Sequence, residues 1–341
     1  MPGSIPTRRP GWQTPGSKLS SLDLVVLGDC NPDLVISGDD VTPDFGQAEK
    51  LVSRMSLMTG GSAAITAVAA ARLGLSVALV AAVGDDAAGA LMLSLLSAEG
   101  VDTSYVAVRT GLATGMTAVL SAGPDRAILT ALGAMTSLSV GDMPAELLSR
   151  ARLFHVSSYF LLEEAIGSWL GGLFAAARAA GVLTSLDTNF DPAGRWGDER
   201  LRAALGEVDL FLPNEAEALG IAGSTSVAAA GSLLAGQGRS VVIKLGARGA
   251  LCWPANGAGG ALVAVPAVEP ADTTGAGDCF NAGLIAGLLD GLDLPHAVAV
   301  GCAAGAASTA GLGGTGAVVD RATAFGGAAA ATFTPADPAL R

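Results

Sequence analysis

The chain has 341 residues, half of them hydrophobic, so it is long and apolar enough for a large buried core. Its 19 basic and 31 acidic residues give a formal net charge of −12 with no basic stripe, which argues against nucleic-acid binding. Four cysteines without a CxxC pair and only two histidines argue against a zinc site, and they favour reduced thiols in a cytoplasm.

Both ends of the chain are expected to be tails. Residues 1–20 contain four prolines and no apolar block, which argues against a signal peptide and for disorder. Residues 321–341 are rich in Ala and Pro, and we expect the chain to fray from about Phe325. The uncharged stretch Leu294–Val319 has few large apolar side chains, so it favours tight helix packing over a membrane span.

Between these tails, apolar β-type runs alternate with helical stretches. This alternation is typical of one domain, residues 21–320, with a mostly parallel sheet covered by helices on both faces. The expected strands are Leu22–Leu27, Val77–Val83, Leu153–Ser157, Leu183–Asp187, Leu210–Pro213 and Val241–Leu245. The expected helices are Ser62–Leu73, Ala87–Glu99, Ala165–Ala180, Val227–Ala235, Asp278–Leu289 and Pro295–Thr309.

Two regions, residues 33–58 and 104–131, break this alternation. The second contains two period-two runs, Thr114–Leu120 and Arg126–Thr130, on either side of a Gly-Pro-Asp turn, which predicts a hairpin. We interpret both regions as strands that project from the main sheet to form a lid, although extra edge strands fit the pattern about equally well. Arg126 on this hairpin is placed to reach an anionic substrate.

The segment most informative about chemistry is Asp272-Thr273-Thr274-Gly275-Ala276-Gly277-Asp278, a Gly-rich turn that leads into an apolar helix. Glycines let successive N–H groups point into one concavity, and the helix N-terminus adds partial positive charge, so the turn suits a transferring phosphoryl group. A carboxylate beside phosphates is repulsive unless it has a task there. Accepting the proton of an attacking hydroxyl is such a task for Asp278, and simple helix capping is the alternative.

Other polar strings lie where strands end, which is where α/β proteins bind ligands. Gly28-Asp29-Cys30-Asn31-Pro32-Asp33 suits an Asx-turn, and Asn214 with Glu217 suits a capping box. Lys244-Leu245-Gly246-Ala247-Arg248-Gly249 leaves a strand through a Gly turn of the kind found in hairpins. The diglycine Gly60-Gly61 leads into a helix and permits close approach of either the sheet or a ligand.

Together these segments resemble the motifs of the ribokinase-like (PfkB) carbohydrate kinases, in the family's order and over roughly residues 23–320. The resemblance implies a Rossmann-like three-layer α/β/α sandwich with a mostly parallel sheet and a small β-sheet lid. It implies an enzyme that transfers the γ-phosphate of ATP to a hydroxyl of a sugar or sugar-like substrate. Asp278 would be the general base, and the amides of Gly275, Ala276 and Gly277 would form the anion hole.

On the substrate side, the resemblance assigns Asn31 and Asp33 to substrate hydroxyls, because a carboxylate accepts two donors of a diol. Ile65 stands where the family often has Asn, which indicates a less polar sugar pocket. Asn189 matches a string of family fructokinases, and Tyr159 is a further candidate at another strand end. The expected substrate-binding residues are Asn31, Asp33, Gly60, Gly61, Ser62, Ile65, Arg126, Tyr159 and Asn189.

On the nucleotide side, the resemblance assigns Asn214 and Glu217 to water-mediated Mg²⁺ contacts and the Lys244 loop to ATP. Cys302 falls where adenine-pocket residues would lie, and backbone oxygens of two loops would hold K⁺. The expected nucleotide-binding residues are Asn214, Glu217, Lys244, Leu245, Gly246, Gly249, Gly277 and Cys302. The expected K⁺ site comprises Asp272, Thr274, Ser308, Gly311 and Gly313.

Two other functions fit the sequence less well. A nicotinamide-dependent dehydrogenase needs GxGxxG after the first strand, but Gly28-Asp29-Cys30-Asn31 stands there. A catalytically silent sugar or nucleotide sensor would have no reason to retain Asp278 behind the glycine turn. Fructose, ribose, a keto-deoxy acid or a nucleoside all fit the motifs. We expect no nucleic-acid or membrane partner, and we expect a homodimer through the exposed edges of the lid.

Overall fold

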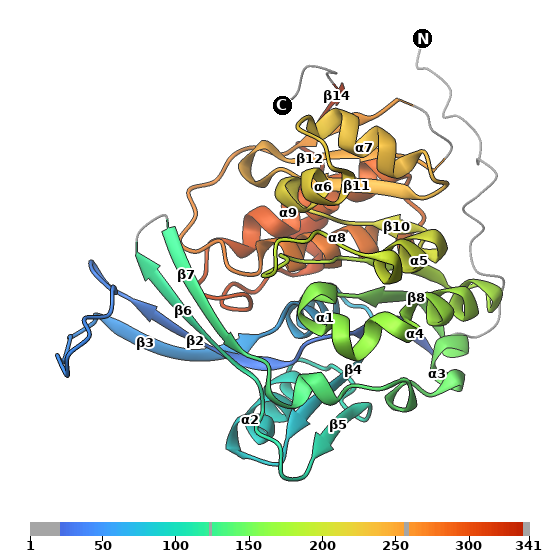
Figure 1. Ribbon diagram of the computed structural model, residues 1–341. Coiled ribbons are helices and arrows are strands. Elements are labelled where there is room, and N and C mark those ends of the chain that lie inside the picture. The colour runs from blue at the N-terminus through green and yellow to red at the C-terminus, as the bar shows by residue number, and fades with distance from the viewer. Residues whose placement is uncertain (1–20, 123–124, 256–258, 337–341) are drawn as a thin grey trace.

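The computed structural model describes residues 21–122, 125–255 and 259–336, which form a large sheet flanked by helices and a smaller sheet at one side (Figure 1). The strands of the large sheet are β1 (Leu22–Leu27), β4 (Val77–Gly84), β5 (Val106–Arg109), β8 (Ala151–Val156), β9 (Leu183–Leu186), β10 (Leu210–Phe211), β11 (Ser240–Lys244), β12 (Ala250–Trp253), β13 (Ala261–Ala264) and β14 (Thr332–Pro335). Over the described residues their order is β14-β13-β12-β11-β10-β9-β8-β1-β4-β5. The run from β11 to β5 is parallel, which is the expected mostly parallel arrangement.

Helices cover both faces of this sheet because its central strands are apolar on both sides. Alternate residues of β4 enter two separate cores, with Val77 and Leu79 in one and Ala78 and Val80 in the other. The first core is closed by α1 (Ser62–Arg72), α2 (Ala87–Ala98), α8 (Ala276–Leu289), α9 (Leu294–Ser308) and α10 (Arg321–Ala328). The second is closed by α3 (Ala145–Arg150), α4 (Tyr159–Ala179), α5 (Glu199–Glu207), α6 (Glu215–Ala222) and α7 (Val227–Ala235). The predicted α/β/α sandwich is confirmed.

The smaller sheet is the predicted lid. Its strands are β2 (Asn31–Ser37), β3 (Arg54–Gly60), β6 (Met116–Ala122) and β7 (Asp125–Ala131), in the order β3-β2-β6-β7. β6 and β7 form the expected hairpin, and the sheet extends away from the helical layers (Figure 1). β5 lies within residues 104–131, yet it pairs with β4 at the edge of the large sheet.

The pairing register gives the lid two chemically different faces. Asp33, Thr117 and Thr130 form one cross-strand row, and Asp33 and Thr117 are buried, so we call this the inner face. Side chains alternate along a strand, so the neighbouring residues point to the outer face. Two rows on the outer face are apolar throughout, Leu57-Leu34-Ala118-Leu129 and Met55-Ile36-Leu120-Ala127.

The C-terminal end is more ordered than its composition predicted. Fraying from Phe325 is wrong, because α10 and β14 lie there. The Asp320 carboxylate caps α10 by accepting a hydrogen bond from the Thr323 amide at 2.8 Å, and Ala324 is fully buried. β14 then pairs with β13 at the end of the large sheet. The expected N-terminal tail, residues 1–20, lies outside the described residues.

Two apolar stretches belong to the cores of the domain. Residues 294–319 contain α9, which packs between α8 and α10 and buries most of its residues, as tight helix packing requires. α4 is long and apolar enough to cross a membrane by length and composition alone. One face of α4 is occupied in the second core, where Ile166, Leu170 and Phe174 are buried.

Candidate active site

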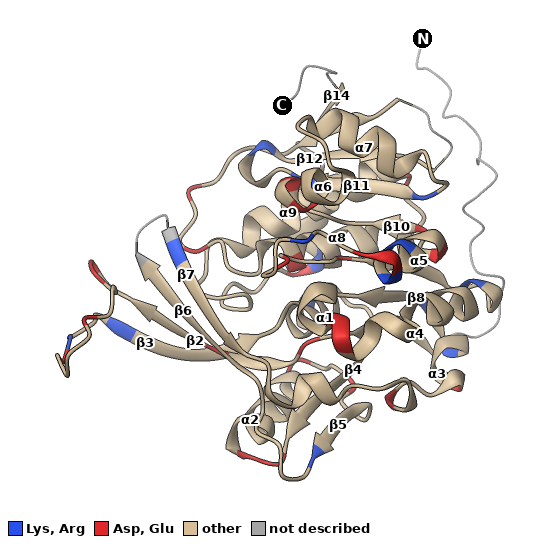
Figure 2. Ribbon diagram, viewed as in Figure 1, with Lys and Arg blue, Asp and Glu red and all other residues tan. Residues whose placement is uncertain are grey.

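Neighbouring parallel strands end at one edge of the large sheet and bring polar residues together there. Asp29 follows β1, Asp187 follows β9, Asn214 follows β10, and Lys244 ends β11. Carboxyl ends of parallel strands meet at the same edge, which is where open α/β sheets bind ligands. Lys244 places a positive charge at this edge. The other Lys and Arg residues are scattered over the drawn elements and form no continuous basic surface there (Figure 2).

Asp278 lies in the first turn of α8 and is only 7% exposed. It is not the cap of the helix, because the N-cap position is Gly275, whose φ of 73° lies in the left-handed region. Burial raises the pKa of Asp278 well above its ordinary value, and the nearby Asp187 carboxylate raises it further, whereas Lys244 and the Ser62 hydroxyl favour the ionised form. A carboxyl whose pKa is raised in this way holds a proton more tightly than a solvated carboxyl does, which suits a general base.

The turn in front of Asp278 is held by close contacts that need glycine. A Cβ on Gly275 would lie 2.4 Å from the Cα of Gly314, so the two loops touch backbone to backbone. Ile65 packs against the same two glycines. First-turn amides of a helix have no intrahelical acceptor, so the amides of Gly277 and Asp278 are available to an anion. The Ala276 amide, which we also expected in the anion hole, instead donates to the Thr273 carbonyl oxygen at 3.3 Å.

Lys244 supplies a positive charge beside this turn. Its ammonium donates a hydrogen bond to Asp187 Oδ2, and the same oxygen accepts a hydrogen bond from Asn281 Nδ2 at 2.6 Å. Burial alone would lower the pKa of Lys244, but the attraction of Asp187, Glu217 and Asp278 outweighs it and raises the pKa. Lys244 therefore stays charged at the centre of a carboxylate cluster.

Asn214 and Glu217 form the capping box of α6. Asn214 Oδ1 accepts from the Glu217 amide at 3.0 Å, and Glu217 Oε2 accepts from the Asn214 amide at 2.8 Å. Burial, followed by repulsion from Asp187, raises the pKa of Glu217 to about 7. Asn214 also lines an open cavity of about 590 Å³ together with Glu215, Ala216, Leu219, Lys244, Leu245 and Gly246. The capping reading is thus correct, and it leaves these residues beside a cavity at the sheet edge.

Asn31 and Asp33 lie where β1 passes into the lid. Asn31 Nδ2 donates to Asp33 Oδ1 at 3.0 Å and to Thr117 Oγ1 at 3.1 Å, which fixes the carboxylate on the inner lid face. A Cβ on Gly60 would lie 1.9 Å from Asp33 Oδ1, so only glycine fits beside it. Burial and the nearby Asp29 raise the pKa of Asp33 to about 7.

Asp29 is a site residue that sequence reasoning missed. Its carboxylate accepts hydrogen bonds from the amides of Ser62 at 3.1 Å and Ala63 at 2.9 Å, so it caps α1 across 34 positions of sequence. Gly61 at the N-cap has a φ of 82° and no side chain to perform this task. A buried Asp directly after a central strand is the only signal that the sequence offered for this role.

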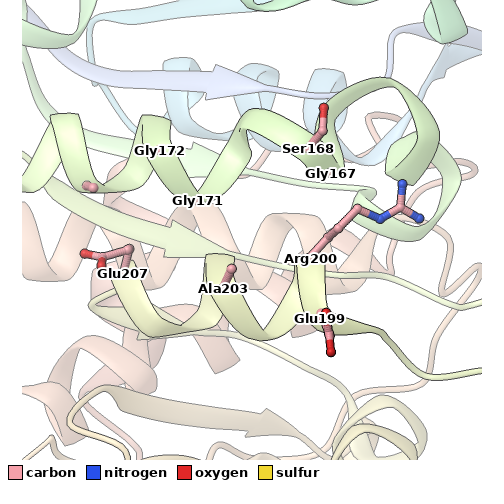
Figure 3. Close-up of a pocket in the computed structure, with 9 residues that line it drawn as sticks. Gly167, Ser168, Gly171, Gly172, Glu199, Arg200, Ala203 and Glu207 are labelled. Carbon is pink, nitrogen blue, oxygen red and sulfur yellow. The ribbon is translucent and has the colours of Figure 1, made fainter.

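Asn189 and Tyr159, both predicted to contact the substrate, lie in different parts of the structure. Asn189 has a φ of 54°, accepts from the Ser158 amide at 2.7 Å, and donates to the Ser62 hydroxyl at 2.9 Å, which brings it beside Asp278. Tyr159 is fully buried in α4, and its hydroxyl lies near Gly167, which lines a groove between α4 and α5 (Figure 3). The structure therefore does not bring Tyr159 to the sheet edge.

The lid hairpin and the expected potassium loops meet beside the glycine turn. Arg126 Nη1 donates to the hydroxyls of Thr273 and Thr274, both at 3.2 Å. Asp272 joins the loops, since its carboxylate accepts from the Thr274 amide at 2.9 Å and the Gly313 amide at 2.8 Å. Ser308 and Gly311 lie on the chain leading into the second loop.

The remaining predicted residues lie toward β12 and β13. Gly249, with a φ of 91°, follows the short turn Gly246–Arg248, and a Cβ there would meet the Val263 carbonyl oxygen at 2.1 Å. Cys302 on α9 is buried and donates to the same carbonyl oxygen at 3.6 Å. Among the described residues, no three His, Cys, Asp or Glu side chains are placed to hold a metal ion directly.

Comparisons with known proteins agree on one family. Residues 21–320 match the model of the pfkB family carbohydrate kinases. The chain is 31% identical over 297 residues to ribokinase of Haemophilus influenzae, covering 84% of this chain and 91% of that protein. It is 30% identical over 279 residues to fructoselysine 6-kinase of Escherichia coli, covering 80% and 95%. Arabidopsis thaliana ribokinase complexed with ribose and ATP has the same fold, with 23% identity, a TM-score of 0.76, and coverage of 90% and 98%.

Asp33→Asn should flatten the pH dependence of stability. The pKa of Asp33 is about 7 in the folded chain and returns to about 4 on unfolding, so the folded state binds the proton more tightly. Stability from this group is therefore present at low pH and is lost as the pH rises through 7. Urea unfolding at pH 5 and pH 8 should show a smaller loss for the variant than for the wild type.

Asp39→Asn, in the exposed part of the loop after β2, is the control for this experiment and should behave like the wild type. Other buried carboxylates titrate in all three proteins, so the difference between the curves isolates Asp33. Equal losses in wild type and Asp33→Asn would contradict the raised pKa.

Proposed function

Since this chain belongs to the pfkB family of carbohydrate kinases and is a phosphotransferase with an alcohol acceptor, we propose that it transfers the γ-phosphate of ATP to a sugar hydroxyl with Asp278 as the general base. The acceptor oxygen forms a bond to the γ-phosphorus while the bond to the β-phosphate oxygen breaks. Asp278 takes the hydroxyl proton and ADP leaves. The observation that carries this proposal is the buried Asp278 carboxyl behind the Gly275 turn.

In this proposal, the anion hole provides most of the rate acceleration. The amides of Gly277 and Asp278 and the dipole of α8 face the position where negative charge builds up on the phosphoryl oxygens. These donors are fixed before reaction because Gly275, Gly314 and Ile65 are packed together. Fixed dipoles need no reorganisation when the charge develops, which is why such sites work better than water.

The nucleotide would occupy the cavity between α6 and the Lys244 loop. Asn214 lines this cavity and is hydrogen-bonded to the buried Glu217. This amide oxygen and carboxylate fit Mg²⁺ held through its waters, and bound Mg²⁺ would neutralise phosphate charge. Gly246 and Gly249 let the loop run close to a bound nucleotide, and Cys302 lies on the adenine side. The tie between Asp272 and Gly313 brings together the two loops that would hold K⁺.

The acceptor is proposed to lie between the lid and α1. Asn31 and Asp33 present hydrogen-bonding groups on the lid, and the diglycine of residues 60–61 exposes backbone. Asn189 reaches the site from the opposite side through Ser62. This arrangement suits vicinal hydroxyls of a sugar, and a nucleoside carries the same diol in its ribose.

A screen of hexoses, pentoses, sugar acids, sugar amines and nucleosides for ADP release distinguishes these substrates, and a binding-only sensor would release ADP with none of them.

Asp278→Asn should lower kcat by roughly 100-fold or more, because general bases contribute on that scale, while ATP binding is retained. Asp290→Asn at the C-terminal end of the same helix is the matched control and should keep the wild-type kcat. Turnover is measured by ADP release with the best substrate of the screen. Near-normal kcat in Asp278→Asn would refute the assignment of the base.

Glu217→Gln should raise the Mg²⁺ concentration needed for half-maximal activity. The neutral amide attracts the hydrated cation less, whereas the capping of α6 can persist through the amide oxygen. Glu207→Gln, at the C-terminal end of α5 and paired with Arg178 outside this cavity, is the control. An unchanged Mg²⁺ titration would remove Glu217 from this role.

The same assay in K⁺ and in Na⁺ tests the proposed potassium site. If the site binds K⁺, activity should be higher in K⁺ than in Na⁺.

We also propose that two copies associate through the outer face of the lid. Sequence reasoning pointed to the edges of the lid, but Met55, Leu57 and Leu129 on its outer face are 59%, 48% and 62% exposed, which is unusual for adjacent large apolar residues. Leu57→Lys combined with Leu129→Lys should convert a dimer into a monomer in light-scattering measurements. Val318→Lys, at a 74% exposed position away from the lid, should not. A monomeric wild type would contradict the proposal.

A further inference from the structure

The carboxyl edge of the sheet contains an ion pair that the proposed chemistry has not yet used. Asp187 and Lys244 end β9 and β11, and β10 lies between these strands, so the pair spans the end of an intervening strand. Asp187 is 1% exposed and the Lys244 side chain is 13% exposed. A buried ion pair seldom adds stability over apolar side chains of similar volume, so its presence here points to a role other than holding the fold together.

Asp187 is fixed from three directions. Its Oδ2 accepts from the Lys244 ammonium and from Asn281 Nδ2, and its Oδ1 accepts from the Asn189 amide at 3.2 Å. Asn281 is fully buried on α8, one turn after Asp278. The carboxylate thus ties the end of β11 to the helix that carries the general base.

This arrangement aims Lys244 at the glycine turn. A Cβ built on Gly277 would lie 3.7 Å from Lys244 Nζ and 3.9 Å from its Cδ, so the lysine side chain runs along the first turn of α8. Lys244 also lines the cavity assigned to the nucleotide. Its ammonium therefore stands between that cavity and Asp278, where a γ-phosphate must pass on its way to the acceptor.

The charges around Lys244 explain why a partner is needed to hold it there. Asp187, Glu217 and Asp278 all attract the ammonium, and they come from the end of β9, from α6 and from α8. Without a dominant partner the flexible side chain could settle on Glu217 or Asp278, where it would occupy the metal side of the cavity or neutralise the base. Asp187 Oδ2 accepts a hydrogen bond from Lys244 and is itself held by Asn281, so the ammonium is fixed beside Asp187 rather than beside Glu217 or Asp278.

We propose that Asp187, anchored by Asn281, is a positioning residue that holds Lys244 in contact with the transferring phosphoryl group. The inference rests on the proposed kinase reaction and adds a side-chain cation to the backbone anion hole. Lys244 stabilises charge on the phosphoryl oxygens and on the departing ADP, whereas Asp187 touches neither substrate and acts only through Lys244.

The test is a double-mutant cycle on kcat. Lys244→Met removes the charge at similar length and should lower kcat by roughly 100-fold or more, with the KM of the sugar little changed. Asp187→Asn releases the lysine and should lower kcat by roughly 10- to 100-fold through misplacement. In the Lys244→Met background, Asp187→Asn should have an effect of less than about 2-fold, because residues that act as a unit are not additive.

Rescue and folding controls keep the cycle decisive. Lys244→Arg keeps the charge and should be at least about 10-fold faster than Lys244→Met, which a purely structural role would not require. The double variant removes both charges of the Asp187–Lys244 pair, so neither partner is left buried without the other, and it should fold even where a single variant does not. Asp209→Asn is the matched control and should leave kcat unchanged, because Asp209 directly precedes β10 and accepts a hydrogen bond from the Thr184 amide of β9 at 3.0 Å, at the other end of these strands.

Several outcomes would overturn the inference. If the fold-loss of kcat in the double variant equals the product of the losses in Lys244→Met and Asp187→Asn, Asp187 acts independently of Lys244. If added Mg²⁺ restores kcat in Asp187→Asn, that carboxylate belongs to the metal site. Wild-type kcat in Lys244→Met would exclude the phosphoryl contact. If the wild type phosphorylates a sugar and Asp278→Asn does not, these outcomes reject this inference alone. The proposed function fails instead if the wild type has no kinase activity in the screen or if Asp278→Asn keeps near-normal kcat.

Discussion

The burial of the Asp278 carboxyl is the constraint on which the rest of the site depends. A carboxyl that is 7% exposed loses most of its hydration, and this loss raises its pKa above the ordinary value. Asp187 and Asp29 add repulsion, whereas Lys244 and the Ser62 hydroxyl favour the charged form. The protonation of Asp278 is therefore set by a balance among several strand ends and two helices, and a change at any of them reaches the base.

Close backbone contacts transmit this constraint to the rest of the fold. The Gly275 turn rests on Gly314, so the position of the proposed anion hole depends on the loop around residues 311–317. Arg72, at the far end of α1, holds that loop by donating to the carbonyl oxygens of Thr315 at 2.8 Å and Ala317 at 2.9 Å. Ile65 of the same helix packs on both glycines. α1 therefore positions the proposed anion hole as well as the proposed substrate side of the site.

Local sequence patterns predicted the elements, whereas contacts over long sequence distances remained hidden. β1 and α7 have the expected bounds because their apolar patterns and flanking residues are local signals. The Asp187–Lys244 pair joins residues 57 positions apart, and only the strand order makes them neighbours.

Two expectations failed because composition and position along the chain were weighed without tertiary context. The Ala-rich C-terminal end forms a helix because Asp320 caps it and Ala324 finds a buried place, neither of which composition expresses. Tyr159 follows a strand end, yet Ser158 takes a φ of 60° and turns the chain into α4, so the ring enters the second core. The glycine turn before Asp278 was predictable because its chemistry lies in one continuous segment.

In the proposed reaction, the lid combines substrate recognition with closure in one structural unit. Asn31 and Asp33 belong to its first strand, so an acceptor held by them moves with the lid. The far end of the lid meets the phosphate side, where Arg126 bonds to Thr273 and Thr274 in front of the anion hole. In the proposed reaction, the contact that brings a hydroxyl to Asp278 is thus made by the same sheet that covers the glycine turn. Water lacks the paired hydroxyls that Asp33 would hold, so it cannot fix the lid in this position, and transfer to water is disfavoured by the geometry of closure as well as by exclusion.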